Sequence, residues 1–359
     1  MKIFKDKNFT EQNSEVFPKV SIIILNWNGW KDTIECLESV FRINYPNYQV
    51  IVVDNGSTDD SVEKIREYCE GKLRVESEFF EYNLDNKPIK IIEYSRGELE
   101  REIKEEKSDD LPADRKLILI RNEKNIGFAG GCNIGIQYAL RIRAKYIWLL
   151  NNDTVVDSDA LMRLVKAAQR NSKIGFVGSK IFFYNNPNLI WSFGEYSFSI
   201  KSKFFKKYNN LHSSQLNEES LVNHLVGCSL LVRVDMINDI GMLDERYFMY
   251  GEEHDWEQRA KNAGWLLLAV SSSKVYHKIS KGTRGNYYIR DYYRTRNSLY
   301  LIQKYSHFKF KLYISFLIRL LIGNILRGEY KSLPAIIRGI CDFIRGVQGV
   351  GNIMLGKKE

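Results

Sequence analysis

Short apolar runs alternate with segments of helical spacing from the start of the folded part of this chain. Residues 20–25 read VSIIIL and residues 48–53 read YQVIVV, and such β-branched runs predict buried strands. Four apolar side chains between them recur every three to four residues, which predicts a helix over 30–42. Strand, helix and strand in this order need a crossover connection, so we expect an α/β fold with a mostly parallel sheet.

The segment 76–116 interrupts this alternation. It carries 13 acidic and 8 basic residues, which predicts a solvated insertion or a mobile helical excursion. Strands and helices alternate again after it. The further strands are expected at 116–121, 146–150, 174–179, 225–232 and 266–270, and the further helices at 61–68, 133–142, 158–170 and within 249–264.

The net charge of +9 lies in the C-terminal part of the chain. Residues 286–359 hold 13 Lys and Arg against 4 Asp and Glu, so residues 1–285 sum to zero. We therefore divide the chain into an N-terminal extension (1–18), a catalytic α/β domain (19–285) and a basic amphipathic helical region (286–359). Basic and apolar residues mixed in this way predict helices that lie on an anionic membrane surface. A helical pair packed on the catalytic domain, or a homodimer contact, is an equally weighted alternative.

Cysteine usage and hydropathy limit where the protein works. The five cysteines form no C-x-x-C pair, which argues against a disulfide framework or a structural zinc site and fits a reducing cytoplasm. The first 17 residues lack the apolar core of a secretory signal. The longest apolar stretch, 312–322, contains Arg319 and is too short to span a bilayer. We expect a cytoplasmic protein with peripheral association to the inner face of the cell membrane.

Three polar clusters fall at the ends of predicted strands, at 26–29, 54–57 and 151–153. Asn, Asp and Gly favour turns, so any one cluster could be turn chemistry alone. In parallel α/β sheets, however, ligands bind beyond the carboxyl ends of the strands. Three such clusters at the ends of strands of one sheet therefore predict a binding site at that edge.

Five ordered motifs carry a family resemblance: VSIIILNWNG, VIVVDNGSTDDS, NIGFAGGCNIGI, LLNNDT and MYGEEHDWEQRAKNAGW. Together they resemble an inverting family 2 glycosyltransferase with the GT-A fold. The similarity covers residues 19 to about 300 and is strongest to the rhamnosyltransferase-like branch that builds surface polysaccharides. It implies a Rossmann-like, mostly parallel sheet flanked by helices that binds a nucleotide-diphospho-sugar.

The resemblance assigns a donor site to the strand ends and the Gly-rich segment. Asp54 would hold the uracil or thymine of the donor, and Asn125 and Asn133 would contact the nucleotide sugar. Glycines let a backbone approach a ligand closely, and the N-terminus of the following helix could face phosphate oxygens. The expected donor-binding residues are Asn26, Asn28, Asp54, Asn125, Gly127, Gly130, Asn133, Asn152 and Asp153.

A metal site and a catalytic acid cluster follow from the same resemblance. Asp153 stands where the family holds Mg²⁺ or Mn²⁺ on the diphosphate, and His277 would complete that site; imidazole suits Mn²⁺ better than Mg²⁺. Glu253 takes the place of the general base, where the family usually has Asp. Asp255 would help to position the acceptor or the base.

The predicted reaction moves rhamnose or another hexose from a dTDP- or UDP-sugar to a hydroxyl of a glycan or lipid-linked acceptor, with inversion. Arg290, Arg294 and Arg296, which alternate with tyrosines, would suit donor or polyprenyl-diphosphate phosphates. No nucleic-acid recognition motif is present, so nucleic acid is not an expected partner. The alternatives are a nucleotidyltransferase of similar architecture and a non-catalytic scaffold of a polysaccharide assembly complex.

Overall fold

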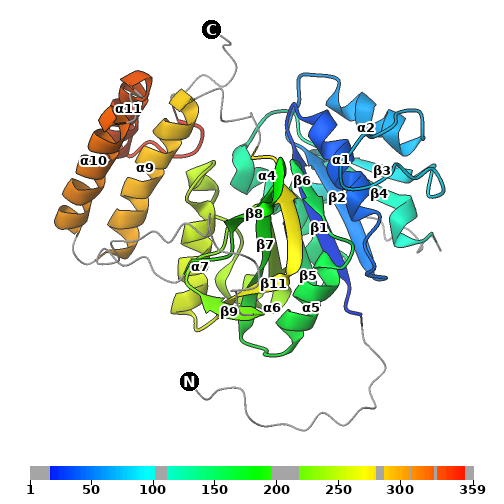
Figure 1. The fold of residues 1–359 in the computed structure, drawn as a ribbon. Coiled ribbons are helices and arrows are strands. Elements are labelled where there is room, and N and C mark those ends of the chain that lie inside the picture. Colours follow the sequence, from blue (N-terminus) through cyan, green and yellow to red (C-terminus); the bar gives the residue numbers. More distant parts are fainter. Residues whose placement is uncertain are drawn as a thin grey trace.

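The computed structural model describes residues 17–101, 111–195, 218–279, 287–306, 309–326 and 330–351. Within these residues, one sheet of 11 strands forms the centre of the molecule, with helices on both faces (Figure 1). The strand order is β3-β4-β2-β1-β5-β10-β7-β11-β6, with β8 paired to β7 and β9 paired to β11. The predicted α/β fold with a mostly parallel sheet and flanking helices is confirmed.

Parallel pairing joins β3, β4, β2, β1 and β5 on one side of the sheet. Strand β10 enters antiparallel between β5 and β7, and β11 then runs parallel to β7. The strands are β1 (Val20–Asn26), β2 (Tyr48–Asp54), β3 (Lys90–Ser95), β4 (Lys116–Arg121), β5 (Tyr146–Asn151), β6 (Thr154–Val156), β7 (Ile174–Phe183), β8 (Asn186–Ser192), β9 (Glu219–Val222), β10 (Ser229–Arg233) and β11 (Leu266–His277).

The register of the parallel strands brings their carboxyl ends to one edge. Asn26 pairs with Asp54, Asp54 pairs with Arg121, and Leu25 pairs with Asn151. Polar residues that lie far apart in the sequence therefore follow strands that end side by side. This edge is where the binding site was predicted.

Two layers of helices bury the two faces of the sheet. Successive side chains of a strand point to opposite faces. Ile22 and Ile24 accordingly join the core that contains α1, α2 and α5, and Ile23 joins the core that contains α4, α6 and α7. These helices are α1 (Trp30–Val40), α2 (Ser61–Cys69), α4 (Gly127–Arg141), α5 (Ala160–Gln169), α6 (Val234–Ile240) and α7 (Glu252–Asn262).

Glycines let α4 lie close to β1. A Cβ added at Gly135 would come 2.7 Å from Ile23 Cγ2, and one added at Gly131 would overlap the Leu25 side chain. The helix begins at Gly127, not near Asn133 as predicted. The Gly-rich segment therefore forms the first turns of the helix. Its glycines allow these turns to pack closely against β1.

The charged segment 76–116 contributes an edge strand that the sequence analysis missed. Lys90–Ser95 forms β3, parallel to β4, and Arg96–Arg101 forms the short helix α3. Ile91 and Ile92 give this strand its apolar contacts with the two cores. Two apolar residues among so many charges gave no visible strand pattern. Residues 102–110 lie outside the described part of the chain.

The basic region packs on the catalytic domain through α9 (Tyr287–Tyr305). Its side chains Tyr292 and Tyr293 are fully buried, and the Tyr293 ring stacks on Phe248 at 5.1 Å between centroids. Helices α10 (Lys309–Leu326) and α11 (Leu333–Ile344) lie beside α9 (Figure 1). Of the alternatives for this region, the packed helical pair is the arrangement that α9 and α11 adopt. In the described ranges, no helix is both long and apolar enough to cross a membrane.

We expect Gly135→Ala to lower the free energy of unfolding by about 1–3 kcal/mol, the usual cost of overpacking a core. Ile23 is β-branched and lies on a central strand, so its Cγ2 cannot rotate away from an added methyl group. Urea unfolding measures the change. Gly97→Ala in α3 is the matched control, because nothing lies within 4 Å of its added Cβ. That variant should be neutral or more stable by up to about 1 kcal/mol. Equal effects of the two substitutions would contradict the close packing of α4.

Candidate active site

Hydrogen bonds join the polar side chains that follow β1 and β2. Asn26 Nδ2 donates to Asp54 Oδ1 at 2.8 Å and to Ser57 Oγ at 3.1 Å. Ser57 Oγ donates to the same carboxylate oxygen at 2.6 Å, and the Ser57 amide donates to Asp54 Oδ2 at 3.1 Å. Asn26 and Asp54 are buried. Because a buried carboxylate needs such donors, this set fixes the orientation of Asp54 at the sheet edge.

Thr33 and Asn152 extend these hydrogen bonds to the end of β5. Thr33 Oγ1 donates to Asn26 Oδ1 at 2.7 Å, and Asn152 Nδ2 donates to Thr33 Oγ1 at 3.0 Å. A Cβ added at Gly29 would come 2.8 Å from Asn152 Nδ2, so the loops after β1 and β5 are in contact. The sequence analysis missed Thr33, because a threonine inside a helical pattern gives no signal of its own.

Asn28 ties the loop after β1 to the loop after β2. Its φ of 51° lies in the left-handed region, which Asn tolerates better than most residues. Its Oδ1 accepts from the amides of Thr58 at 2.7 Å and Asp59 at 3.3 Å, and its own amide donates to Ser57 Oγ at 2.9 Å. Asn28 thus fixes the position of the loop after β1 relative to residues 57–59.

Asn55 is the centre of a second group of hydrogen bonds that the predicted residue set omitted. Its Nδ2 donates to Asn125 Oδ1 at 3.1 Å and to the Gly127 carbonyl at 3.0 Å. Its Oδ1 accepts from Asn122 Nδ2 at 3.0 Å and from the Ile126 amide at 3.2 Å. These bonds fix the loop that carries Asn125. The sequence feature that could have identified Asn55 is its position directly after Asp54.

The N-terminus of α4 already has protein acceptors. Asn125 Oδ1 accepts from the Gly127 amide at 2.8 Å, and the Phe248 carbonyl accepts from Phe128 at 2.7 Å and Ala129 at 3.4 Å. Gly127 has a φ of 86°, and its added Cβ would come 2.5 Å from the Phe248 carbonyl oxygen. The expectation that this helix end faces phosphate oxygens is therefore wrong for its first amides. The loop that contains Phe248 covers them.

Asn133 and Gly130 hold α4 in place. Asn133 Nδ2 donates to the Leu243 carbonyl and to Glu245 Oε1, each at 2.9 Å, and its Oδ1 accepts from the Leu243 amide at 3.2 Å. The residue is 2% exposed. A Cβ added at Gly130 would come 3.1 Å from the Ile126 side chain. The amide of Asn133 is thus used within the protein, which differs from the donor contact expected for it.

Asp153 and His277 meet beyond the ends of β5 and β11, as the sequence analysis predicted. His277 Nε2 lies 3.1 Å from Asp153 Oδ1, although 124 residues separate them in the sequence. Both side chains are largely buried, and the Lys278 amide donates to the Asp153 carbonyl at 2.9 Å. His277 Nδ1 is buried with no hydrogen-bond partner among the described residues. A carboxylate and an imidazole that face each other can ligate a divalent cation.

Glu252 and Glu253 begin α7 at this same edge. A Cβ added at Gly227 would overlap Glu253 Oε1, so the carboxyl group lies directly on that backbone. The next residue, Cys228, accepts the Asn151 amide at 3.0 Å, which brings Glu253 to the end of β5. Burial raises the pKa of Glu253, and burial beside Glu253 raises that of Glu252 well above its usual range. A carboxylate with a raised pKa is suited to accept a proton near neutral pH.

Asp255 connects α7 to helix α9. Its carboxylate is fully buried and accepts from Tyr247 at 3.2 Å, Arg259 at 2.9 Å, Lys304 at 2.6 Å and Tyr305 at 2.7 Å. Burial alone would raise its pKa, but these donors outweigh it and hold the pKa low. Asp255 thus positions α7 by joining it to α9.

Two residues of α9 support the acidic cluster in a similar way. Asn297 Nδ2 donates to the carbonyls of Tyr247, Met249 and Tyr250 at 2.7–2.8 Å. Arg296 is fully buried and donates to the Tyr247 carbonyl at 3.2 Å and the Gly349 carbonyl at 2.8 Å. The interpretation of Arg296 as a phosphate ligand is therefore wrong. Its guanidinium is used to hold the loop before α7.

Lys278 places a cation next to the Asp153–His277 pair. Its Nζ lies 2.6 Å from Asp32 and 2.5 Å from Glu35 on α1, and Glu35 also accepts the Tyr184 hydroxyl at 2.7 Å. Burial disfavours the charged form, but the two carboxylates outweigh it and raise the pKa of Lys278. The sequence analysis gave this lysine no role, because its acidic partners lie about 240 residues away.

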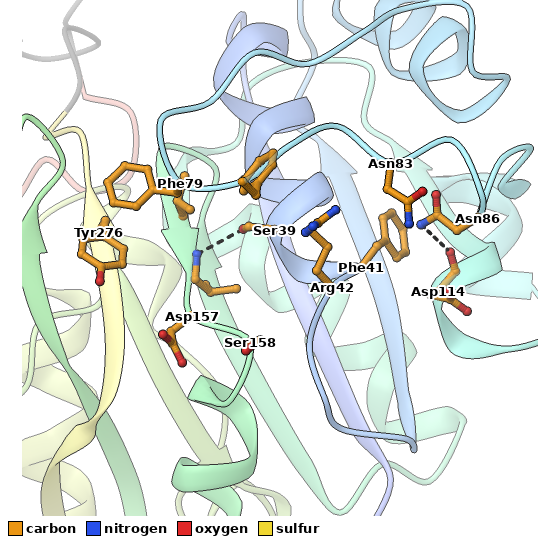
Figure 2. A pocket seen from close by; sticks show the side chains of 13 residues that line it. Ser39, Phe41, Arg42, Phe79, Asn83, Asn86, Asp114, Asp157, Ser158 and Tyr276 are labelled. Carbon is orange, nitrogen blue, oxygen red and sulfur yellow. Dashed lines mark hydrogen bonds between the residues drawn. The ribbon is translucent and has the colours of Figure 1, made fainter.

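A cavity of about 570 Å³ lies beside the C-terminal end of α1 (Figure 2). Phe79 and Tyr276 stand at one end, with ring centroids 4.4 Å apart, and Asn83, Asn86 and Asp114 stand at the other. None of the predicted site residues lines it. The candidate active site is therefore separate from this cavity, and it is defined by the hydrogen bonds and acidic side chains at the sheet edge. The lining residues are Ser39, Phe41, Arg42, Phe79, Phe80, Asn83, Asn86, Asp114, Val155, Val156, Asp157, Ser158 and Tyr276.

Comparison with known proteins gives the family context of this geometry. Residues 21–98 and 91–241 match the profile described as Glycosyl transferase family 2. The dTDP-rhamnosyl transferase RfbF of Shigella flexneri is 23% identical over 256 residues, which is 68% of this chain and 83% of that protein. The poly-beta-1,6-N-acetyl-D-glucosamine synthase of Staphylococcus epidermidis is 20% identical over 300 residues, 79% of this chain and 60% of that protein.

Solved structures show the same fold. The mannosyltransferase PcManGT of Pyrobaculum calidifontis, in complex with GDP-Man and Mn²⁺, superposes with a TM-score of 0.52 at 13% identity, over 94% of this chain and 77% of that one. TarS of S. aureus in complex with UDP-GlcNAc gives 0.51 at 15% identity, over 92% and 81%. Since the family profile spans more than half of the sequence and the GT-A architecture agrees, this chain belongs to glycosyl transferase family 2 and transfers a sugar from a nucleotide-sugar donor.

Proposed function

We propose that this chain is an inverting, metal-dependent hexosyltransferase that uses a dTDP- or UDP-linked donor and a hydroxyl of a glycan or lipid-linked acceptor. The observation that carries the proposal is the approach of three chemically distinct groups at one sheet edge. Asp153 and His277 face each other at 3.1 Å. Glu253 lies on the backbone that borders the end of the same strand β5. This arrangement supports the assignment of a leaving-group site beside a proton acceptor.

The donor end of the site is supported by the fixed orientation of Asp54. Its Oδ2 receives one protein hydrogen bond, from the Ser57 amide at 3.1 Å, and its Oδ1 receives two. Carboxylate oxygens have further lone pairs, so Oδ2 can still accept the ring N–H of uracil or thymine. The loop with Asn125, held by Asn55, borders the same edge. Asn26, Asn28 and Asn152 act in this proposal by keeping the loops in place.

The residues present fit a divalent cation. His277 Nδ1 is a buried atom without a partner among the described residues, and its ring faces a buried carboxylate. No group of three such ligands occurs in the described ranges, so donor phosphate oxygens would have to supply the rest. Asp153 and His277 would hold Mn²⁺ or Mg²⁺. A cation held there would supply positive charge that offsets the charge of the departing diphosphate.

Glu253 acts as the general base in this mechanism. The acceptor hydroxyl attacks the anomeric carbon, its proton passes to the Glu253 carboxylate, and the nucleoside diphosphate leaves from the opposite face of the sugar. One displacement inverts the anomeric configuration. The raised pKa of Glu253 favours proton transfer, and the preformed strand-end contacts hold the donor in line.

A dTDP-rhamnose donor is the first candidate to test. Two of the distant relatives, by their names, are rhamnosyl transferases: the Shigella flexneri enzyme and the N-acetylglucosaminyl-diphospho-decaprenol L-rhamnosyltransferase of Mycobacterium tuberculosis. The second is 43% identical, but over 65 residues only, 18% of this chain. UDP-linked galactofuranose, glucose and N-acetylhexosamines stay in the same test because the sugar-contacting side chains are not identified.

Helices α10 and α11 support an association with the inner face of the cell membrane. Ile314 and Ile318 lie one turn apart on α10 and are 42% and 49% exposed. Ile337 and Ile344 lie two turns apart on α11 and are 58% and 75% exposed. Exposed isoleucines in a segment of charge +9 suit a surface of anionic lipid.

The roles of Asp153 and Glu253 predict opposite behaviour of two isosteric variants. In thermal unfolding, a correct donor with Mn²⁺ should raise the Tm, and EDTA should remove most of that shift. Asp153→Asn should lose at least about tenfold in donor affinity in Mn²⁺ because it removes a charged ligand. Glu253→Gln should keep the shift but lose about 10²- to 10⁴-fold in turnover, the range of general base catalysis.

Analysis of the released product serves as the control for reaction type. A transferase releases nucleoside diphosphate, a nucleotidyltransferase would release pyrophosphate, and a scaffold would release neither. Full turnover of Asp153→Asn in EDTA would refute the metal site. Normal turnover of Glu253→Gln would refute the base.

The membrane proposal predicts that Ile337→Glu with Ile344→Glu weakens binding to vesicles of phosphatidylglycerol and phosphatidylcholine. Burying one isoleucine contributes about 1.5–3 kcal/mol, so the partition coefficient should fall by about tenfold or more. Sedimentation with vesicles measures it. Leu84→Glu, an exposed apolar residue outside the tail, is the matched control. Unchanged sedimentation of the double variant, with a loss of dimer in solution, would assign the isoleucines to a homodimer contact instead.

A further inference from the structure

A carboxylate–imidazole pair, formed by buried Glu257 and partly buried His224, lies next to the acidic cluster. His224 Nδ1 lies 2.7 Å from Glu257 Oε2, and Glu257 Oε1 accepts the Leu225 amide at 2.8 Å. Glu257 is 1% exposed. With both of its oxygens engaged by the segment that carries His224, the glutamate holds the imidazole ring in one position. The established family chemistry does not require this pair.

The backbone and the ring of His224 are fixed from two further sides. His224 and Glu195 exchange backbone hydrogen bonds at 2.9 and 3.3 Å, an isolated bridge beyond the end of β8. The His224 ring stacks on the His254 ring with centroids 4.0 Å apart. Burial lowers the pKa of His254 to about 3, so this neighbour is neutral. The stack therefore sets one uncharged ring against His224.

The charges favour an imidazolium at His224 and place it beside Glu253. Burial lowers the pKa of His224, but the Glu257 carboxylate more than offsets this, and Glu253 adds to the rise. Burial raises the pKa of Glu253, and the His224 charge opposes that rise. Glu253 lies over Gly227, three residues after His224. The segment 224–227 thus carries His224 at one end and contacts the Glu253 carboxyl group at the other.

The surrounding titratable and charged groups come from several elements. Among the described groups that shift the pKa of Glu253, His224 is the one whose positive charge lowers it. The groups are Glu252, His254, Glu257 and Lys261 on α7, Glu195 after β8, Cys132 on α4, Cys228 before β10 and Arg294 on α9.

We propose that His224, held by Glu257, is a positioning residue for the general base: its imidazolium keeps the Glu253 carboxylate ionised and in place over Gly227. The inference rests on the proposed role of Glu253. Without this charge, burial and the neighbouring Glu257 carboxylate would raise the pKa of Glu253 further. The pair thus keeps available the carboxylate that must receive the acceptor proton.

The coupling between His224 and Glu253 can be measured from the histidine, without substrate. The chain has five histidines, so ¹³C-labelled histidine gives five resonances, and His224→Gln assigns one of them. In the wild-type protein we expect His224 to titrate above 6.5. Glu257→Gln should lower that pKa by about one unit or more, as expected for loss of an adjacent opposite charge. Coupling is reciprocal, so Glu253→Gln should lower it as well.

Glu252→Gln is the matched control for this titration. Burial raises the pKa of Glu252 well above its usual range, and Glu252 is not among the groups that shift the pKa of His224, so its amide variant should leave His224 unchanged. A His224 that titrates at or below 6.5, or that does not respond to Glu253→Gln, overturns the proposal. A response to Glu257→Gln alone reduces the pair to a structural contact and also overturns it.

The pH dependence of turnover tests the same claim from the base. In His224→Gln, the Glu257 carboxylate faces Glu253 unopposed, so the acid limb of the turnover profile should move up by about one pH unit. His254→Gln, which removes a neutral ring, should not move that limb. A uniform loss of turnover with the limb unmoved overturns the proposal. An error in the general-base assignment of Glu253 can be told apart from an error in this inference. In that case Glu253→Gln turns over normally, while the His224 titration still responds to Glu253→Gln.

Discussion

The arrangement of the site depends on the side-chain amide of Asn26, which is 0% exposed and forms hydrogen bonds through both its nitrogen and its oxygen. Its two N–H groups serve Asp54 and Ser57, and its oxygen accepts from Thr33. Leaving such a buried group without a partner costs about 1–3 kcal/mol, so the loops after β1 and β2 are held in a single arrangement. Thr33 in turn accepts a hydrogen bond from Asn152, the neighbour of Asp153. The proposed donor end and the proposed metal end of the site are therefore joined by one chain of hydrogen bonds, the kind of preorganisation that lowers a reaction barrier.

The acidic cluster at the start of α7 depends on a second set of contacts, which comes from helix α9. Phe248 and Tyr250 have φ values of 65° and 63°, a left-handed conformation that is unfavourable for such bulky residues and persists only where surrounding contacts enforce it. Asn297 on α9 supplies that support through three backbone carbonyls of this loop, and Asp255 fixes the other end of the contact to Lys304 and Tyr305. Helix α9 of the basic region thus holds the loop that precedes Glu252 and Glu253.

Motifs that follow strands were predictable from the sequence, because parallel strands bring their carboxyl ends together whatever the intervening sequence. The pairing of Asp153 with His277 came from the family resemblance, and the strand ends bring the two side chains together across 124 residues. Partners supplied by tertiary contacts were not predictable. Asn133 is used by the Leu243 segment, and the buried Asp255 is enclosed by α9. Thr33 and Asn55 looked like ordinary helix and turn residues, and β3 was hidden in a charged segment. The Gly-rich motif was recognised, but its glycines fit α4 against β1, a packing requirement that a motif alone does not separate from ligand contact.

The central claim is that one sheet edge holds the nucleobase, the diphosphate metal and the general base in fixed relation. Crystals grown with Mn²⁺ and dTDP or UDP, measured at the manganese absorption edge, test it most directly. The account predicts an anomalous peak within coordination distance of both the Asp153 carboxylate and His277, with the base of the nucleotide against Asp54 and the Glu253 carboxylate facing the open side of the diphosphate. A nucleotide bound elsewhere, or a manganese peak that touches neither Asp153 nor His277, would contradict it.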